Sequence, residues 1–372
     1  MERLSYLESH LYASQRKEAA AQVLKEWRGN CLKIILNRPK AYNALCSKMN
    51  PELFKAIEEA NQSAKVCIVK SILAGKVFSA GGDIKELVAM KKNGTQAALI
   101  RQFNSLMFAM SQAKPIKIAF WDGIVMGAGV GLSVNSNIKI ATENTAFAMP
   151  EAKLGHFTDV GASYFLSRLK KNIGLFLALT AYSLKGKQAY QVGVADYFVN
   201  SKDLPALEAE IEELSLDPTV NEALIRKTIE KYAEKIPQVY EGEDLIAEIF
   251  QGKDVSEVLE KLKQKSEENA TVKKWYEDIL KNSAISLFYG FELLKRGKKL
   301  NLHEALSIEE YLASKERQED LYEGVRIVLV DKGARPNWKT TLQDIPALKV
   351  EEFFPEQIKL IDYQSYLDQL HV

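Results

Sequence analysis

Residues 78–87 of the chain read Phe-Ser-Ala-Gly-Gly-Asp-Ile-Lys-Glu-Leu, and residues 123–131 read Gly-Ile-Val-Met-Gly-Ala-Gly-Val-Gly. Each segment follows a run of β-forming residues, so each predicts a tight turn at the end of a strand. Glycine lets the backbone approach a ligand closely, and two convergent backbone N–H groups form an oxyanion hole. The alternative is that both segments are only turns. A dinucleotide-binding fingerprint is excluded, because the G-x-G-x-x-G pattern that starts at Gly127 meets Leu132 where it needs glycine.

The elements around these two segments predict an α/β fold. Residues 44–64 have the apolar spacing of a helix and lie between β-type runs at 31–36 and 66–73. Further β-type runs follow at 116–121, 138–142 and 146–149. After about residue 204 strands nearly vanish, and the chain becomes a series of Lys/Glu-rich amphipathic segments, at 206–215, 219–236, 243–262, 268–298 and 302–313.

This pattern divides the chain into three parts. Residues 1–30 carry scattered apolar groups among charges and predict a helical N-terminal extension. Residues 31–205 form the α/β core. Residues 206–372 form a largely helical C-terminal region, and the segment 322–329, with Gly324 and Arg326, is suited to packing on the core. We therefore expect the C-terminal region to cover the core rather than to form an independent domain.

Composition excludes several classes of protein. The 372 residues include 50 Lys plus Arg against 49 Asp plus Glu, so no global basic field attracts nucleic acid. No apolar run approaches the roughly 18 residues that span a bilayer. The three cysteines, Cys31, Cys46 and Cys67, lack metal-ligand spacing and predict reduced core residues. The four histidines show no mutual spacing of a metal site either.

Two carboxylates lie downstream of the glycine-rich segments. Glu151 and Asp159 are eight residues apart on either side of a probable loop. Beside an oxyanion hole, two carboxylates can divide the work of a base or nucleophile from that of orienting the substrate. The alternative reading is a pair of solvated loop acids. Ser163 does not fit a nucleophile elbow, because Phe165 occupies the last glycine position, and His156 is either catalytic or an ordinary loop residue.

The motifs, in their order and spacing, resemble a known family. The segments 37–45 (Asn-Arg-Pro-Lys-Ala-Tyr-Asn-Ala-Leu), 78–87 and 123–132 are similar to those of the crotonase (enoyl-CoA hydratase/isomerase) superfamily. Within it, residues 148–161 (Ala-Met-Pro-Glu-Ala-Lys-Leu-Gly-His-Phe-Thr-Asp-Val-Gly) and 323–332 resemble the 3-hydroxyisobutyryl-CoA hydrolase branch. The resemblance extends from about residue 30 to about residue 340.

The resemblance implies a crotonase-type spiral of ββα repeats that binds a CoA thioester. The backbone N–H groups of Gly82 and Ala128 would form the oxyanion hole, with alanine standing where the family usually has glycine. The catalytic carboxylates would be Glu151 and Asp159. By the same resemblance, Ala41, Asp83 and Ile84 would contact CoA. No metal and no cofactor are implied, since CoA is part of the substrate.

The resemblance also separates hydrolysis from hydration. Hydratases of the superfamily use two glutamates, and the first would fall at Gly131, so that acid is missing. This loss favours a CoA-thioester hydrolase, most simply of 3-hydroxyisobutyryl-CoA in valine catabolism, with Glu151 as either nucleophile or base. Three departures from the branch, Gln102, Ala128 and Thr158, weaken that expectation. The alternative is a catalytically weakened member that serves as a structural subunit of a large mitochondrial assembly, such as the small subunit of the mitochondrial ribosome.

Partners and compartment follow from the same resemblance. It implies an acyl-CoA substrate, a homo-oligomer or a place in a large mitochondrial assembly, no insertion in a membrane, and location in the mitochondrial matrix. The first thirty residues mix basic with acidic side chains and show no recognisable transit peptide. No nucleic-acid-binding motif was found.

Overall fold

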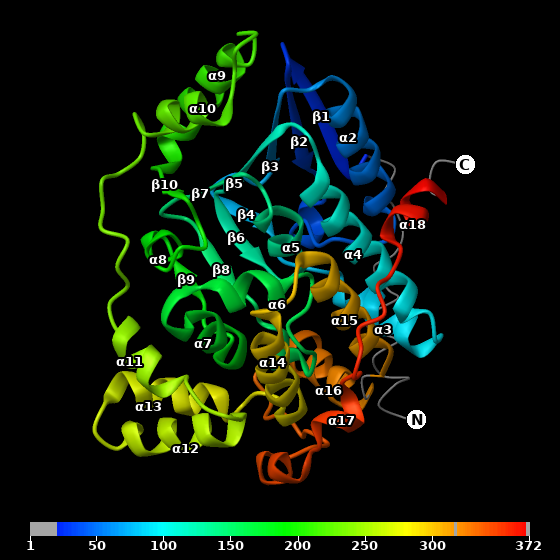
Figure 1. The fold of residues 1–372 in the computed structure, drawn as a ribbon, viewed down its shortest axis with the longest axis vertical. Helices are drawn as coiled ribbons and strands as arrows, with labels where there is room; N and C mark the ends of the chain where they lie inside the picture. The colour runs from blue at the N-terminus through cyan, green and yellow to red at the C-terminus, as the bar shows by residue number, and fades with distance from the viewer. Residues whose placement is uncertain (1–20, 316–317, 370–372) are drawn as a thin grey trace.

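The computed structural model describes residues 21–315 and 318–369, and its strands form two sheets (Figure 1). The larger sheet has the order β1-β2-β3-β5-β7-β10, and the smaller one has the order β4-β6-β8-β9. The larger sheet consists of β1 (Val23–Arg28), β2 (Cys31–Leu36), β3 (Val66–Ser71), β5 (Ile116–Trp121), β7 (Ile138–Ala141) and β10 (Tyr197–Phe198). The smaller sheet consists of β4 (Lys76–Ser79), β6 (Gly123–Met126), β8 (Ala146–Ala148) and β9 (Leu184–Lys185).

Successive strands alternate between the two sheets. β3 is followed by β4, β5 by β6, and β7 by β8, and all neighbouring pairs among these six strands are parallel. Each pair contributes one strand to each sheet before the chain returns through helical segments. The predicted α/β spiral of ββα repeats is therefore confirmed. Strands β2 and β3 are buried on both faces, and their largely apolar runs are typical of such strands.

The predicted helical extension is wrong for residues 23–28. These residues form β1, which pairs antiparallel with β2 from Val23 opposite Leu36 to Arg28 opposite Cys31. As an edge strand, β1 buries little: Trp27 is 40% exposed. The strand therefore lacks the alternation of apolar and polar residues that identifies a half-buried strand, and pairing with β2 overrides the local pattern. The rest of the predicted extension, residues 1–20, lies outside the described residues.

Helices surround the sheets. Those of the first two hundred residues are η2 (Pro39–Ala41), α2 (Met49–Ser63), α3 (Ile84–Lys92), α4 (Gln96–Gln112), α5 (Ala128–Val134), η3 (Glu151–Leu154), α6 (Ala162–Phe165), η4 (Leu166–Arg168), η5 (Lys170–Asn172), α7 (Ile173–Thr180), α8 (Lys187–Gln191) and η6 (Ser201–Asp203). The C-terminal region contributes α9 (Leu204–Leu214), α10 (Glu222–Ile229), α11 (Glu243–Ile249), α12 (Val255–Ser266), α13 (Ala270–Ile279), α14 (Ala284–Gly297), α15 (Leu302–Lys315), α16 (Gln318–Leu329), η7 (Leu342–Ala347), α17 (Val350–Phe353) and α18 (Tyr363–Gln369).

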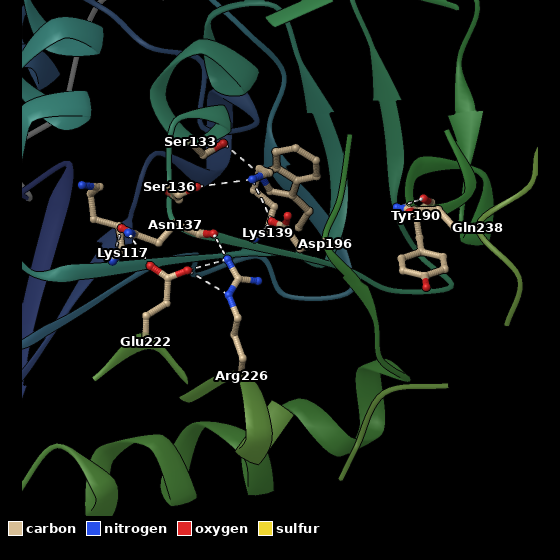
Figure 2. Close-up of polar contacts among 11 residues, drawn as sticks. Lys117, Ser133, Ser136, Asn137, Lys139, Tyr190, Asp196, Glu222, Arg226 and Gln238 are labelled. Atoms are coloured by element: carbon tan, nitrogen blue, oxygen red, sulfur yellow. Dashed lines mark hydrogen bonds and ion pairs between the residues drawn. The ribbon is translucent and has the colours of Figure 1, made fainter. Parts of the chain in front are cut away.

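Parts of the C-terminal region pack on different faces of the core (Figure 1). Helices α9 and α10 place Leu207, Ile211 and Ile225 in one apolar cluster with Ile68 and Ile118 of the larger sheet. Figure 2 shows two hydrogen bonds that also hold α10. The Asn137 side-chain amide donates to Glu222 of α10 (2.9 Å), and Arg226 of α10 donates to the Asn137 carbonyl (2.8 Å). These hydrogen bonds hold α10 against the turn before β7.

The remaining C-terminal helices share the main core with the first half of the chain. Phe176 of α7 lies with its ring centroid 5.3 Å from that of Phe250 and 4.9 Å from that of Trp275. Helix α14 packs on α6 and α7, α15 packs on α4, and α16 packs on α3 and η3. All of these helices except α16 contribute to one continuous hydrophobic cluster, and α16 joins α3 through a smaller one.

We predict that the first half cannot fold without the second. A fragment of residues 21–215 exposes apolar side chains such as Phe176 and Leu179, which are fully buried in the whole chain, and it loses the partners that cover them. We expect an insoluble product, or a compact one with secondary structure but no cooperative thermal transition. Circular dichroism and calorimetry of the purified fragment are the measurement. A cooperative unfolding transition would show that the core is an independent domain.

Candidate active site

The two glycine-rich turns lie side by side. After β4, the Leu45 N–H donates to the Gly81 carbonyl (2.8 Å), and the Asp83 N–H donates to the Leu45 carbonyl (2.7 Å). This bridge uses the groups on either side of Gly82 and leaves the N–H of Gly82 facing away from Leu45. After β6, Ala128 begins helix α5, where a backbone N–H has no acceptor within the helix. Among the described residues, no hydrogen bond takes up the N–H of Gly82 or of Ala128.

The packing between these turns is close. A Cβ placed on Gly82 would lie 3.8 Å from the Cβ of Ala128, so the two residues are neighbours. Gly127 has φ +47°, and a Cβ there would lie 2.8 Å from Oε1 of Glu151. Glycine at this position therefore serves both the backbone conformation and the approach of the carboxylate.

Glu151 is a buried carboxylate directly beside the turns. It begins η3, two residues after the buried Met149 that follows β8, and only 6% of it is exposed. Its Oε2 has no hydrogen-bond partner among the described residues. Burial, and after it the negative charge of Asp159, raise the pKa of Glu151 to about 8. An acid with such a pKa accepts and returns a proton readily near neutral pH.

Asp159 lies on the loop after η3 and pairs with a histidine. The Nε2 atom of His156 is 3.1 Å from Oδ2 of Asp159, and His156 is buried, with its ring centroid 4.5 Å from that of Phe157. The reading of Glu151 and Asp159 as solvated loop acids does not fit these positions. His156 is buried and contacts Asp159, and its role as catalytic or ordinary stays open.

All of these groups line one cavity of about 80 Å³. Its wall contains the segments 80–84 and 127–128, the carboxylates Glu151 and Asp159, and His156. Apolar side chains complete the wall: Leu87, Ile100, Phe103, Leu154, Val160 and Leu321. The site therefore combines two backbone donors, two carboxylates and a small apolar chamber, an arrangement compatible with acyl transfer at a carbonyl.

The three predicted CoA contacts have different surroundings. Asp83 and Ile84 line the cavity, and Asp83 also pairs with Arg38 (2.8 Å) and accepts hydrogen bonds from the first turn of α3. Ala41 lies in η2 and is not part of the cavity wall. It is still near the site, because the next residue, Tyr42, accepts a hydrogen bond from the N–H of Ala80 (3.0 Å). The three CoA contacts remain predictions.

The position of the missing hydratase acid is filled. A Cβ on Gly131 would lie 2.6 Å from the Cβ of Val160, so no larger side chain fits in α5 at this position. Gln102, where the resemblance places a substrate-contacting acid, lies outside the cavity wall, and Asn50 donates to it (3.4 Å). Its neighbour Phe103 faces the cavity instead.

Two structural supports lie behind the catalytic segment. A Cβ on Gly155 would be 2.2 Å from the Asp320 carbonyl oxygen, and one on Gly324 would be 2.2 Å from the Leu154 carbonyl oxygen. The backbones of η3 and α16 are therefore in contact, as the pattern at 322–329 suggested. This contact supports η3, the segment that begins with Glu151. The second support is Glu309 of α15, which accepts hydrogen bonds from the loop after Asp159. It was not identified from the sequence, although it is a charged residue on a helix face shared with Leu306 and Leu312.

Other classes of site find no support in residues 21–315 and 318–369. No group of three or more His, Cys, Asp or Glu residues in this part could hold a metal ion. None of its helices is long and apolar enough to cross a membrane. Cys31, Cys46 and Cys67 are free and buried, as predicted.

The fold is of the crotonase type, and comparisons with known proteins agree. The family model described as enoyl-CoA hydratase/isomerase matches residues 31–354, so the chain belongs to that family. The resemblance noted in the sequence is thereby confirmed.

The chain is similar to curated proteins named "3-hydroxyisobutyryl-CoA hydrolase, mitochondrial". The protein from Gallus gallus is 36% identical over 91% of this chain and 89% of its own length. The protein from Homo sapiens is 36% identical over 89% of this chain and 87% of its own. The solved structure of an enoyl-CoA hydratase from Rhodobacter sphaeroides has a TM-score of 0.77 at 26% identity, covering 89% of this chain and 96% of that one. A carnitinyl-CoA dehydratase from Mycobacterium thermoresistibile has a TM-score of 0.80 at 24% identity, covering 93% and 99%.

Proposed function

We propose that this protein hydrolyses the thioester of 3-hydroxyisobutyryl-CoA, as in valine catabolism. The observation that carries the proposal is the single buried glutamate, Glu151, beside two unpaired backbone donors, with Val160 filling the space of a second glutamate at Gly131. Relatives that span most of the chain bear the name of this hydrolase. An enzyme that adds water across a double bond needs paired acid and base groups, whereas thioester cleavage needs one carboxylate and an oxyanion hole.

The geometry supports a simple division of work. The thioester carbonyl oxygen accepts hydrogen bonds from the N–H groups of Gly82 and Ala128, which stabilise the negative charge of the tetrahedral intermediate. No metal and no other cofactor is required, because these donors supply the polarisation that a Lewis acid would give.

Glu151 supplies the chemistry in one of two ways. As a nucleophile, its carboxylate bonds to the acyl carbon, the C–S bond breaks, CoA leaves as a thiolate that takes up a proton, and water then cleaves the acyl anhydride. As a base, it takes a proton from water while the oxygen of that water bonds to the acyl carbon, and it returns the proton to the departing thiolate. Asp159, held by His156, orients the acyl group or the water in either case.

The cavity favours a short acyl group. At about 80 Å³ between Phe103, Val160 and Leu321, it has room for a few carbon atoms, whereas pockets for larger ligands typically span 300 Å³ or more. The polar groups Asp159 and His156 in the same wall suit a hydroxylated acyl chain. Both properties fit the 3-hydroxyisobutyryl group.

The site also bears on the structural-subunit alternative. A chain that had lost its activity would have no need to keep a buried carboxyl group whose Oε2 has no hydrogen-bond partner among the described residues, since burying an unpaired polar group destabilises the fold. Glu151 is such a group, which favours the enzyme. We further propose that the protein acts in the mitochondrial matrix, because its relatives are named mitochondrial, and that it forms a small homo-oligomer. Sizing of the native protein separates a small oligomer from a large assembly.

The test of the proposed function is a comparison of two substrates. Release of free thiol from 3-hydroxyisobutyryl-CoA is measured beside hydration of crotonyl-CoA by the same preparation. We expect rapid thiol release and negligible hydration. Hydration faster than hydrolysis, or no release of thiol, would contradict the proposal.

The raised pKa of Glu151 predicts the pH dependence of hydrolysis. Both roles of Glu151 need the carboxylate, and with a pKa of about 8 this form is the minority species at neutral pH. We therefore expect kcat/KM to rise about tenfold per pH unit from about pH 6 and to level off above pH 8. Initial rates of thiol release across this range are the measurement. A profile already flat at pH 6 would show that Glu151 is not the titrating group.

A further inference from the structure

Glu309 is a fully buried carboxylate outside the cavity that serves no step described so far. It lies on α15, with none of its surface exposed. Its Oε2 accepts the N–H of Gly161 (2.7 Å), and its Oε1 accepts the N–H of Ser163 (3.0 Å) and the hydroxyl of Ser163 (2.5 Å). Burial raises the pKa of Glu309 to about 8, although the hydrogen bonds from Ser163 and Gly161 act in the opposite direction. These three hydrogen bonds to its two oxygens fix the orientation of the Glu309 carboxyl group.

The turn that Glu309 holds has an unfavourable backbone. Val160 has φ +54°, a left-handed conformation that β-branched residues rarely adopt, and Gly161 follows with φ +84°. Such a conformation persists only where the surroundings impose it. Gly161 and Ser163, which follow the strained residue, donate hydrogen bonds to Glu309, and these hydrogen bonds supply the constraint.

Both catalytic features of the loop depend on that turn. Asp159 immediately precedes Val160, and its carboxylate lies 3.1 Å from His156 at the cavity wall. Val160 itself packs against Gly131 and fills the space that a hydratase acid would occupy. A turn that relaxed toward ordinary dihedral angles would move Asp159 and open the space beside Gly131.

Helix α15 is itself fixed to the wall of the cavity. The Asn104 side chain of α4 donates to the Leu306 carbonyl (3.2 Å), and α15 packs along α4. Because α4 also carries Phe103, α15 packs on a helix that forms part of the cavity wall. The position of Glu309 is thus fixed relative to the cavity.

We propose that Glu309 is a positioning residue for hydrolysis, which clamps the 159–163 turn so that Asp159 faces the acyl group and Val160 closes the space beside Gly131. This inference rests on the proposed function. It assigns Glu309 no contact with substrate: the residue acts through the hydrogen bonds it accepts from Gly161 and Ser163.

The test uses two adjacent glutamates of α15. In Glu309→Gln, the amide group faces a backbone N–H with a second donor, so at least one of the three hydrogen bonds is lost. We expect kcat for 3-hydroxyisobutyryl-CoA to fall about 100-fold with KM little changed, because a displaced catalytic group costs turnover rather than binding of CoA. Glu310→Gln is the matched control: Glu310 is also buried, but it pairs with Arg101 and Tyr363 and makes no hydrogen bond to the turn among the described residues. Its kcat should stay near that of the wild type.

Two further measurements separate positioning from general stability. Ser163→Ala removes only the hydroxyl hydrogen bond and should lower kcat in the same direction by a smaller factor, in case Glu309→Gln does not fold. Proton NMR of the His156 ring should show shifted resonances in Glu309→Gln and unshifted ones in Glu310→Gln, which reports the placement of Asp159 without any assay of activity.

The outcomes are distinct. If the kcat and the His156 resonances of Glu309→Gln both match the wild type, or if both glutamate variants lose activity equally, the positioning role is wrong. A wild-type protein that releases no thiol would overturn the proposed function alone, since the His156 resonances would still decide whether Glu309 places Asp159.

Discussion

Replacing Glu151 with glutamine should abolish hydrolysis of 3-hydroxyisobutyryl-CoA, with a loss of at least about 10³-fold in kcat. The amide has nearly the volume of the carboxylate, so it fits beside Gly127, but it can neither attack the acyl carbon nor take a proton from water. The oxyanion hole and the CoA contacts stay in place, and binding of the thioester should therefore change little. Thiol release measures kcat, and titration calorimetry with CoA esters measures binding.

The same substitution should not destabilise the protein, which distinguishes loss of chemistry from loss of fold. The pKa of Glu151 is raised from 4.5 to about 8 on folding. A carboxyl whose pKa is raised contributes its full stability below about pH 4.5, and this contribution is lost as the pH rises through 8. Glutamine does not titrate, so the variant should melt at or above the wild-type temperature, with a difference that grows from about pH 4.5 and levels off above pH 8.

Asp159→Asn provides a graded comparison. It should weaken turnover in the same direction but less, since the amide can still accept a hydrogen bond from the histidine beside it. If wild-type hydrolysis is no faster than that of Glu151→Gln, the carboxylate is idle, and the structural-subunit alternative becomes the better account of the protein.

The sequence predicted those parts of the fold that local patterns encode. The strands at 31–36 and 66–71 are largely apolar, and α2 has clear helical spacing, so their types followed from the residues alone. Strand β1 did not, because its polar sequence at the sheet edge resembles a charged helix as much as a strand. Only the pairing partner, β2, distinguishes the two, and that pairing is a tertiary contact.

In the site, too, residues in local motifs could be predicted, whereas those connected only by tertiary contacts could not. Gly82, Ala128, Glu151 and Asp159 stand in motifs, and the structure brings all four to one cavity. Their catalytic roles remain proposals. Glu309 lies 150 residues after Asp159, so nothing in the local sequence connects them. The obstruction of Gly131 by Val160 depends on a left-handed backbone that no residue pattern announces, since valine is among the residues least expected there.

The oxyanion hole can be tested by a substitution that eliminates one of its two backbone N–H groups. Ala128 is the first residue of α5, and proline is well tolerated at the first position of a helix, where its missing N–H breaks no helical hydrogen bond. The preceding residue, Gly127, lacks the side chain that would clash with the proline ring. Ala128→Pro therefore deletes a proposed oxyanion donor while preserving the helix.

We expect Ala128→Pro to lower kcat by about 10²- to 10³-fold, the usual effect of removing one oxyanion donor. Ala128→Gly is the matched control: it restores the residue that the family usually has, keeps the N–H, and should retain turnover within a few-fold. The melting temperatures of both variants and their affinity for CoA esters report whether the helix and the binding site survive. If the proline variant folds, binds the ester and still turns over at the wild-type rate, the N–H of Ala128 does not stabilise the transition state, and the donor to the thioester oxygen must lie elsewhere in the cavity wall.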